Sequence, residues 1–193
     1  MNSIHRNTIY FDEGFDKMEQ LPREFSVKFD SIKVGKKDKT RVSINGIQIG
    51  DFIDDNSLER DYYRFHDIFH YSFSAFLGWS PCTRAMMKRK RKSDPLVDEI
   101  EDGARATITE EAISLAIFSG AKRNNFYKDV KRLSPSLLNL IKEMTQPFEV
   151  HVKTKKEWEN AILKGYSLFR LLIENNGGNI HFDMSNQSAT YEH

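Results

Sequence analysis

The stretch from Leu58 to Leu77 constrains the fold more than any other part of this sequence. It is rich in aromatic residues, and its phenylalanines recur every three or four positions, which is the spacing that gathers side chains on one face of a helix. The residues that share this face are Phe65, Phe69, Phe73 and Phe76. A helix with so broad an aromatic face has to be packed against other elements, so we expect it to belong to a helical core.

A strand-like pattern precedes this helix, from Glu24 to Ile53. Apolar and polar residues alternate there, with a charged turn at residues 35–39 and a second turn at Asn45-Gly46. The pattern predicts a small antiparallel sheet of roughly three strands. The segment has no histidine and its acidic residues do not cluster, so we expect it to cover one end of the core or to form an oligomer contact, and not to be catalytic.

The remainder of the chain is predicted to be mostly helical. Helices are expected at residues 58–77, 83–90, 95–120, 137–144 and 155–175, and residues 179–191 should form a terminal hairpin or strand. We therefore predict a mainly α fold, with a helical bundle-like core and a small antiparallel β appendage near the N-terminus. The expected division is a β-rich appendage at 1–57, the helical core at 58–175 and a C-terminal extension with a short hairpin at 176–193.

Composition narrows the class of protein. The chain has 193 residues, 39% of them hydrophobic, which is enough for a core that needs no disulfide. Its formal net charge of +1 supplies no global attraction to nucleic acid or membrane, so we expect neither as a partner. One cysteine, Cys82, and an N-terminal segment from Met1 to Phe15 without an apolar run predict a cytoplasmic protein with no signal peptide or membrane span.

Two histidines on the aromatic-rich helix have the spacing of metal ligands. His66 and His70 lie one turn apart, and Asp67 lies beside them. Imidazoles at this spacing can bind one divalent ion, and a nearby carboxylate can bind it too or orient a histidine. The alternative is that these histidines border the core and make only local hydrogen bonds.

The next long helix, residues 95–120, carries a cluster of carboxylates. Glu99, Asp102 and Glu110 share a broad face of this helix, whereas Glu111 falls on another face. The residues expected to lie beside Glu111 are apolar, namely Ile100, Ala104, Leu115 and Phe118. A carboxylate along a buried stripe is costly unless a charge or a metal compensates it, so we expect Glu111 to have a site role or a specific buried partner.

A basic run lies between the two helices. Its residues, preceded by Arg84, are Lys88, Arg89, Lys90, Arg91 and Lys92. Such a run can be a solvated face, a nucleic-acid patch or a clamp for phosphate groups. Because the rest of the chain is balanced in charge, and carboxylates follow immediately, we favour the phosphate clamp.

Several segments resemble the region found beside or fused to MazG nucleotide pyrophosphohydrolase domains. They are residues 63–70, 77–81, 89–95, 97–105 and 110–114, with further likeness at 21–25 and 158–162. The resemblance implies an all-α enzyme that holds Mg²⁺ with an ExxE pair and an ExxD pair and cleaves nucleoside triphosphates to monophosphate and pyrophosphate. Glu99 and Asp102 match the second pair, but His66, Asp67 and His70 stand where the first pair would be.

These observations give a leading hypothesis and two alternatives. The leading hypothesis is a metal-dependent hydrolase of nucleotide phosphoanhydride bonds, with Mg²⁺ expected and Mn²⁺ or Zn²⁺ open because of the histidines. The alternatives are a non-catalytic module that senses a nucleotide or docks onto a protein, and an HD-type phosphohydrolase based on His66-Asp67. By analogy with MazG enzymes, a homodimer is also expected.

The residue roles under the leading hypothesis are as follows. The expected metal ligands are His66, Asp67, His70, Glu99, Asp102 and Glu111. The expected catalytic residues are Asp67, Glu110 and Glu111. The residues expected to bind the nucleotide substrate are Arg64, Arg84, Lys88, Arg89, Lys90, Arg91 and Lys92.

Overall fold

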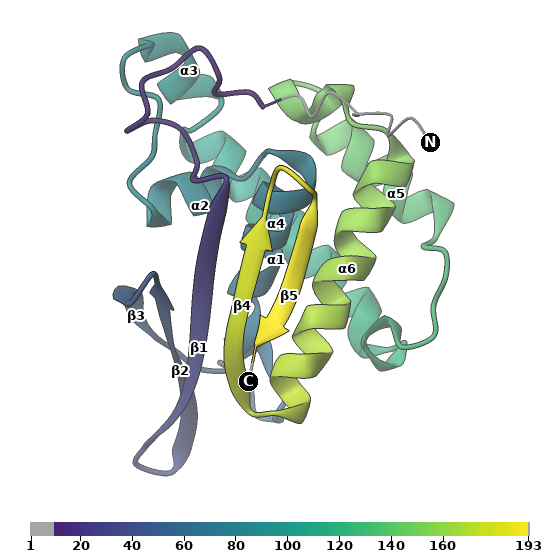
Figure 1. Ribbon diagram of the computed structural model, residues 1–193. Helices are drawn as coiled ribbons and strands as arrows, with labels where there is room; N and C mark the ends of the chain where they lie inside the picture. Colours follow the sequence, from purple (N-terminus) through teal and green to yellow (C-terminus); the bar gives the residue numbers. More distant parts are fainter. Residues whose placement is uncertain (1–9, 193) are drawn as a thin grey trace, which may run out of the picture.

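A five-stranded antiparallel sheet forms one layer of the protein in the computed structural model, which describes residues 10–192 (Figure 1). The strand order is β3-β2-β1-β4-β5. The strands are β1 (Glu24–Val34), β2 (Lys37–Ile44), β3 (Ile47–Ile53), β4 (Gly177–Asp183) and β5 (Ser188–Glu192). Most of the N-terminal segment for which no signal peptide is expected, residues 1–9, lies outside the described part of the chain.

The prediction of a mainly α fold with a β appendage is wrong. The three strands predicted at residues 24–53 and the terminal hairpin are confirmed, but they form one continuous sheet because β4 pairs with β1. In that pairing Phe25 lies opposite Phe182 and Val27 lies opposite Ile180, and all four side chains are buried. The sheet is therefore half of the core in a mixed α/β fold.

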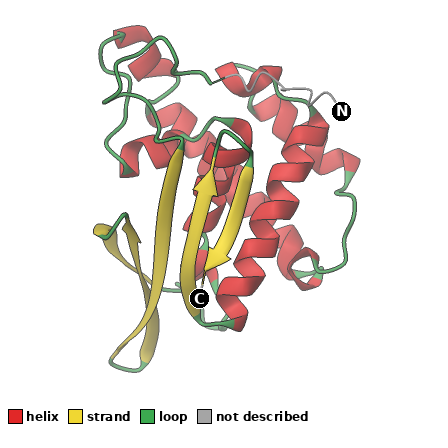
Figure 2. Cartoon of the chain, viewed as in Figure 1, coloured by secondary structure: helices red, strands yellow, loops and turns green. Residues whose placement is uncertain are grey.

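Alternation along β1 determines which face of the sheet is buried. Phe25, Val27 and Phe29 point inward and are almost completely buried, while Glu24 and Lys28 on the opposite face are exposed. The side-chain period of two in a strand makes this one face apolar and the other polar. Helices consequently cover a single face, and Figure 2 shows them behind the sheet and beside it.

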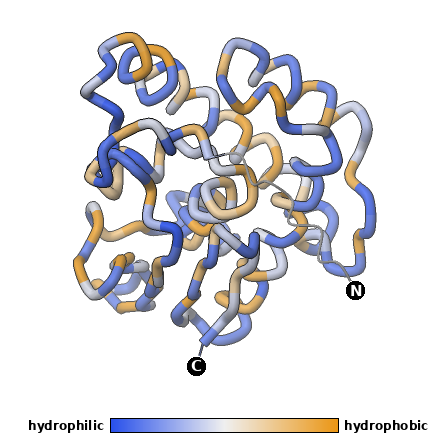
Figure 3. The backbone as a smooth tube through the Cα atoms, turned by 45° about the horizontal axis from the view of Figure 1, so that its top comes forward, coloured by the Kyte–Doolittle hydropathy of each residue, from blue (hydrophilic) through white to orange (hydrophobic). Residues whose placement is uncertain are grey.

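The helices follow the predicted positions in outline. They are α1 (Asp67–Leu77), α2 (Pro81–Met86), α3 (Pro95–Ile100), α4 (Ala104–Lys122), α5 (Pro135–Met144) and α6 (Lys155–Glu174). Short 3-10 turns are η1 (Tyr63–Phe65), η2 (Asn125–Tyr127) and η3 (Glu149–Val152). Figure 3 shows how hydrophobic and hydrophilic residues alternate along these elements, as expected for amphipathic helices and a one-sided sheet.

Helix α1 lies between the sheet and the other helices. Every residue from Ile68 to Leu77 is buried, because the helix carries aromatic and small side chains on all its sides. Phe69 packs on Tyr166 of α6, with ring centroids 4.5 Å apart, and Tyr71 meets Phe29 of β1 at 6.3 Å. The helix predicted at residues 58–77 is longer than the observed one, which begins only at Asp67.

The helix predicted at residues 95–120 is in fact two helices, α3 and α4. Gly103 lies between them, and a Cβ atom there would overlap the backbone carbonyl of Glu99. Only glycine allows this close approach, so the chain turns sharply and α4 starts with a new helical phase.

No helix in the described part of the chain is long and apolar enough to cross a membrane.

Shortening a buried side chain of β4 tests whether the C-terminal hairpin is part of the core. Phe182 is completely buried and stacks on Phe25 at 5.0 Å. We expect Phe182→Ala to lower the free energy of unfolding by about 3–5 kcal/mol, because it leaves a cavity between β4 and α1. Urea denaturation would measure this, with the exposed Thr190→Ala on β5 as the matched control. Equal small effects of both substitutions would show that the hairpin is peripheral.

Candidate metal site

A buried pair of side chains joins α1 to α4. The Nδ1 atom of His70 lies 2.8 Å from Oε1 of Glu110, and both side chains are almost fully buried. The Ser80 hydroxyl also donates to Oε1 of Glu110, at 2.7 Å, and the backbone N–H of Cys82 donates to Oε2 at 2.9 Å. Because the Glu110 carboxylate accepts all three hydrogen bonds, the Nδ1 atom of His70 carries a proton. The Nε2 atom of His70 then points away from Glu110.

The Nε2 atom of His70 is buried and has no hydrogen-bond partner among the described residues. Oε1 of Glu111 lies 3.5 Å away. Burial alone would lower the pKa of His70, but the Glu110 carboxylate and the Cys82 sulfur together outweigh it and raise the pKa well above the usual value. An imidazole oriented through Nδ1 by a carboxylate, with Nε2 left open, is the usual arrangement of a metal-binding histidine.

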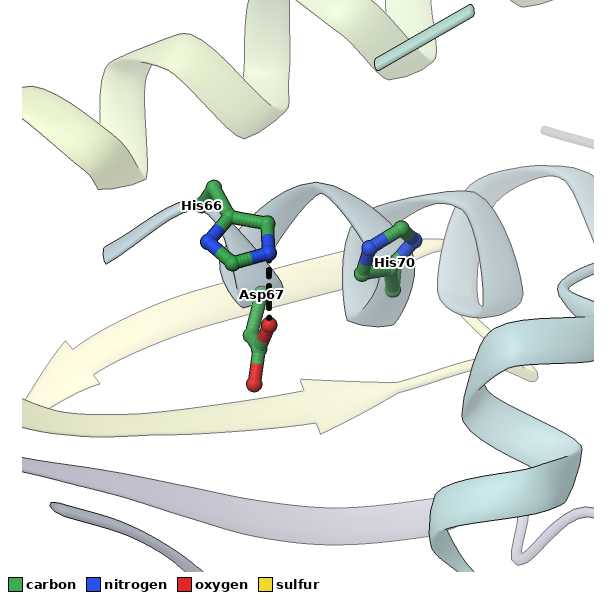
Figure 4. Close-up of side chains that lie close together, drawn as sticks. All are labelled: His66, Asp67 and His70. Carbon is green, nitrogen blue, oxygen red and sulfur yellow. Dashed lines mark ion pairs between the residues drawn. The ribbon is translucent and has the colours of Figure 1, made fainter. Parts of the chain in front are cut away.

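His66 and Asp67 present two electron-rich atoms side by side at the start of α1 (Figure 4). The Nδ1 atom of His66 donates to the carbonyl of Tyr63 at 3.0 Å, so Nε2 carries the lone pair in the neutral ring. Nε2 lies 3.2 Å from Oδ1 of Asp67. Burial lowers the pKa of His66 and favours its neutral form, which leaves two acceptors facing each other. A cation bound between them would relieve this repulsion.

The ligand atoms of two trios lie within 4.8 Å of one another. One trio is His66, Asp67 and His70, and the other is His70, Cys82 and Glu110. The second is a poor metal site because Glu110 is already fully hydrogen-bonded and burial raises the pKa of the Cys82 thiol to about 12. In the first trio His66 and Asp67 present open lone pairs and only His70 has to lose a proton, so it is the better candidate.

The open pocket beside this trio has a volume of about 770 Å³. His66 and Asp67 form part of one wall, Met86 of α2 borders it, and residues 49–53 of β3 form the opposite wall. Sequence reasoning missed this contribution of the β segment, because the packing of β3 opposite α1 has no local signal in the sequence. Ser80 was missed too, although its place before Pro81 marks it as a helix cap.

The ionisable side chains that line this pocket are mostly acidic. They are Lys39, Asp51, Asp54, Asp67 and the neutral His66. Lys39 is itself close to Asp54, at 3.8 Å. The pocket thus attracts cations, and an anionic ligand would need a bound cation to neutralise it.

The structure exchanges the expected positions of Glu110 and Glu111. Glu110 is completely buried, whereas 47% of the Glu111 side chain is exposed. Leu115, expected beside Glu111 in the core, is also exposed. The reason is the break at Gly103, since the new phase of α4 turns Glu110 inward. Glu111 still faces the site from its edge, and its pKa lies below the usual value because the His70 imidazole faces it.

Glu99 and Asp102 do not join the histidines. Glu99 is exposed on α3. Asp102 is completely buried, but its carboxylate is bound by Arg91 at 2.8 Å and lies 3.6 Å from Arg84. Neither acid belongs to a metal-sized group in the described residues. The ExxD motif is therefore present in sequence, yet its aspartate serves a buried ion-pair network.

Three arginines expected to bind phosphate are buried in ion pairs. Arg64 pairs with Asp55 at 3.1 Å, and Arg84 pairs with Asp12 at 2.9 Å. Arg91 bridges Asp102 and the Glu149 carboxylate of η3, both at 2.8 Å. A guanidinium held this way is not free to clamp a phosphate.

The other members of the basic run are more accessible. Lys88 and Lys92 are exposed, and Arg89 and Lys90 are half-buried. Arg89 donates to the backbone carbonyl of Lys17 at 2.9 Å, which ties it to the N-terminal segment. The pocket beside His66 and Asp67 is lined by none of them.

Comparison with known proteins gives a single family assignment. The family described as the MazG C-terminal domain matches residues 6–193, nearly the whole chain. The suspected relation to MazG proteins is thereby confirmed. No curated protein and no solved structure matches.

Replacing Asp102 distinguishes a structural carboxylate from a metal ligand. In Asp102→Asn the buried Arg91 and Arg84 lose their shared partner, so we expect the free energy of unfolding to fall by about 3–5 kcal/mol. Metal binding measured by calorimetry on the folded fraction should not change. Glu99→Gln is the control, since Glu99 is exposed and its loss should alter stability by no more than about 0.5 kcal/mol. A stable Asp102→Asn protein that no longer binds metal would contradict this assignment.

Proposed function

Because the chain belongs to the MazG C-terminal domain family, we propose that it is a metal-dependent hydrolase of a nucleotide phosphoanhydride bond. The observation that carries the proposal is the buried Nε2 of His70, which makes no hydrogen bond to the described residues, is held in place through Glu110 and lies near the ligand atoms of His66 and Asp67. Glu111 is the fourth candidate ligand because its carboxylate is 3.5 Å from the same nitrogen.

The donor set determines which metals fit. Two imidazoles with one or two carboxylates suit Zn²⁺ or Mn²⁺ better than Mg²⁺, which prefers oxygen ligands and water. When bound, such an ion supplies an activated water and neutralises charge on the phosphate oxygens. The acidic lining of the pocket makes this neutralisation necessary, since only Lys39 is cationic there. We therefore propose strict metal dependence with Mn²⁺ or Zn²⁺.

The chain's own residues have separate tasks in this proposal. Glu110 is a positioning residue that fixes the tautomer and the orientation of His70. Glu111 is ionised and half-exposed, so it can accept a proton from a water molecule at the edge of the site. The pocket between α1 and β3, at about 770 Å³, has the size of a small-molecule site and would hold the nucleotide.

A second candidate function is a module that binds a ligand without catalysis. The observation that favours it is the burial of Arg64, Arg84 and Arg91, which removes three of the cations expected to hold phosphate. An HD-type phosphohydrolase receives less support. Its additional histidines would have to lie near His66-Asp67, yet His151 and His181 bond elsewhere and join no metal-sized group in the described residues.

Substituting His70 tests the proposed function directly. We expect His70→Gln to weaken binding of Mn²⁺ or Zn²⁺ by at least about 100-fold and to abolish nucleotide hydrolysis, because a glutamine cannot replace the oriented imidazole. Calorimetry and a panel of nucleoside di- and triphosphates assayed for phosphate and pyrophosphate release would measure both. The control is His151→Gln, an exposed histidine on η3. If wild-type protein binds metal but hydrolyses no nucleotide, the ligand-binding module is the correct alternative.

Metal affinity should rise with pH. The raised pKa keeps His70 protonated at neutral pH in the metal-free protein, so an ion has to displace a proton from Nε2. We expect the affinity to increase about tenfold per pH unit above pH 6.5 and to level off once the pH exceeds the raised pKa of His70. Calorimetry in buffers of different ionisation enthalpy counts the released proton.

Glu110→Gln provides the control for this pH dependence. It removes the carboxylate that raises the pKa of His70, so burial should then lower that pKa. The affinity of this variant should be about 10–100-fold weaker at high pH and should vary little above neutrality. An unchanged pH profile in Glu110→Gln would disprove the role assigned to the pair.

A further inference from the structure

A second cavity, of about 400 Å³, lies between the last turns of α4, the turn η2 and the start of α5. It shares no lining residue with the pocket beside His66 and Asp67. Arg123 at its rim directly follows α4 and is twelve residues beyond Glu111, or roughly 18 Å along the helix axis. The residues that line it are Ala116, Gly120, Arg123, Asn124, Tyr127, Val130, Arg132, Leu133, Ser134 and Leu137. Its lining combines apolar side chains, a phenol and two guanidinium groups.

Tyr127 has a hydroxyl that lacks a partner. Only 7% of the residue is exposed, and its ring packs edge-on against Tyr166 with centroids 5.0 Å apart. Its hydroxyl makes no hydrogen bond to the residues that the structure describes, although the side chain lines the cavity. A hydroxyl on a cavity wall that has no protein partner can donate to a ligand bound in the cavity, and a charged acceptor makes this hydrogen bond stronger.

Positive charge gathers at the rim of this cavity. Arg123 is exposed and forms no ion pair within residues 10–192. Arg123 and Tyr127 both line the cavity; burial raises the pKa of Tyr127, and the Arg123 charge opposes that rise. Arg132 has a side chain that is 86% exposed and forms one ion pair within residues 10–192, with Glu159 at 3.2 Å, which leaves most of its guanidinium accessible. Two such groups are suited to a phosphate or a carboxylate.

The first turn of α5 adds backbone donors. Ser134 precedes this helix without capping it, and Pro135 has no N–H. The N–H groups of Ser136 and Leu137 therefore have no intrahelical partner, and Ser134 and Leu137 line the cavity. A helix start of this kind favours an anion through its free N–H groups and the helix dipole.

The turn that holds Tyr127 is strained and firmly fixed. Asn125, Phe126 and Tyr127 have φ values of 49°, 50° and 56°, which are unfavourable for residues with a side chain. Phe126 packs on Phe169 with centroids 5.2 Å apart, and Arg170 donates to its carbonyl at 2.7 Å. The turn thus keeps Tyr127 in one place at the cavity wall.

We propose that this cavity binds a phosphate monoester that carries an aromatic ring, such as a nucleoside monophosphate. Arg123, Arg132 and the start of α5 hold the phosphate, and the Tyr127 hydroxyl donates to it. The ring lies against the apolar residues Val130, Leu133 and Leu137. This site does not depend on the metal site, and it operates whether or not the protein hydrolyses nucleotides.

The test uses AMP as probe, with adenosine and inorganic phosphate for comparison, on the full chain in EDTA so that no metal contributes. We expect AMP to bind more tightly than either fragment, and Arg123→Gln to weaken AMP binding about 10–100-fold through loss of a charged hydrogen bond. Tyr127→Phe should weaken it about fivefold. Calorimetry measures the affinities, and a thermal melt checks that each variant is folded.

Arg105→Gln is the matched control, because Arg105 is also an exposed arginine on α4 but lies at its first turn, outside the cavity. Its AMP affinity should equal that of the wild type. Failure of AMP to bind, or equal AMP affinities for Arg123→Gln and the wild type, would overturn the proposal. Adenosine binding as tightly as AMP would overturn it as well, since the arginines would then have no phosphate to hold.

Discussion

The Glu110 carboxylate is the interaction on which the arrangement of the helices depends. It accepts hydrogen bonds from three donors on two helices: His70 on α1, and the Ser80 cap and the Cys82 N–H at the start of α2. A carboxylate buried without partners would be strongly unfavourable, so α4 can pack only in a rotation that brings all three donors to Glu110. That rotation also sets Glu111 at the edge of the candidate metal site. Packing and site geometry are thus two results of one buried charge.

A second polar network is present where the sequence predicted a phosphate clamp at the basic run. Arg84 and Arg91 are directed inward and connect Asp12, Asp102 and Glu149, which belong to segments far apart in the chain. Ion pairs of this kind are poor sources of net stability, but they select one arrangement because any other leaves a charge unpaired. Through Asp12, this network holds the N-terminal segment against α2 and α3.

Local patterns in the sequence predicted most of the strands and helices. The alternation at residues 24–53 predicted three strands, and the helix at 155–175 was predicted to within a residue because its apolar residues recur at regular helical spacing. In the structure Thr154 and Glu157 also form a capping box at its start. The pairing of β1 with β4 had no such signal, since it joins residues about 150 positions apart and depends on which face α1 covers. Without it, the sheet was taken for an appendage.

For the candidate site, spacing within one turn was reliable and phase over a long helix was not. His66, Asp67 and His70 lie together as their positions require, whereas the break at Gly103 reversed the expected burial of Glu110 and Glu111. The burial of Arg91 could not be predicted from the sequence either, because burial of a charge depends on partners such as Glu149 that only tertiary structure supplies.

The pairing of β1 with β4 also has a consequence for biosynthesis. The ribosome releases residues 177–183 long after residues 24–34, so the centre of the sheet cannot close until residues 177–183 have emerged. Until then Phe25 of β1 and Tyr71 of α1 lack the cover that Phe182 of β4 provides. Folding that waits for such a distant contact is slow and leaves an apolar surface open to aggregation. The nascent chain is therefore expected to need protection by chaperones during synthesis.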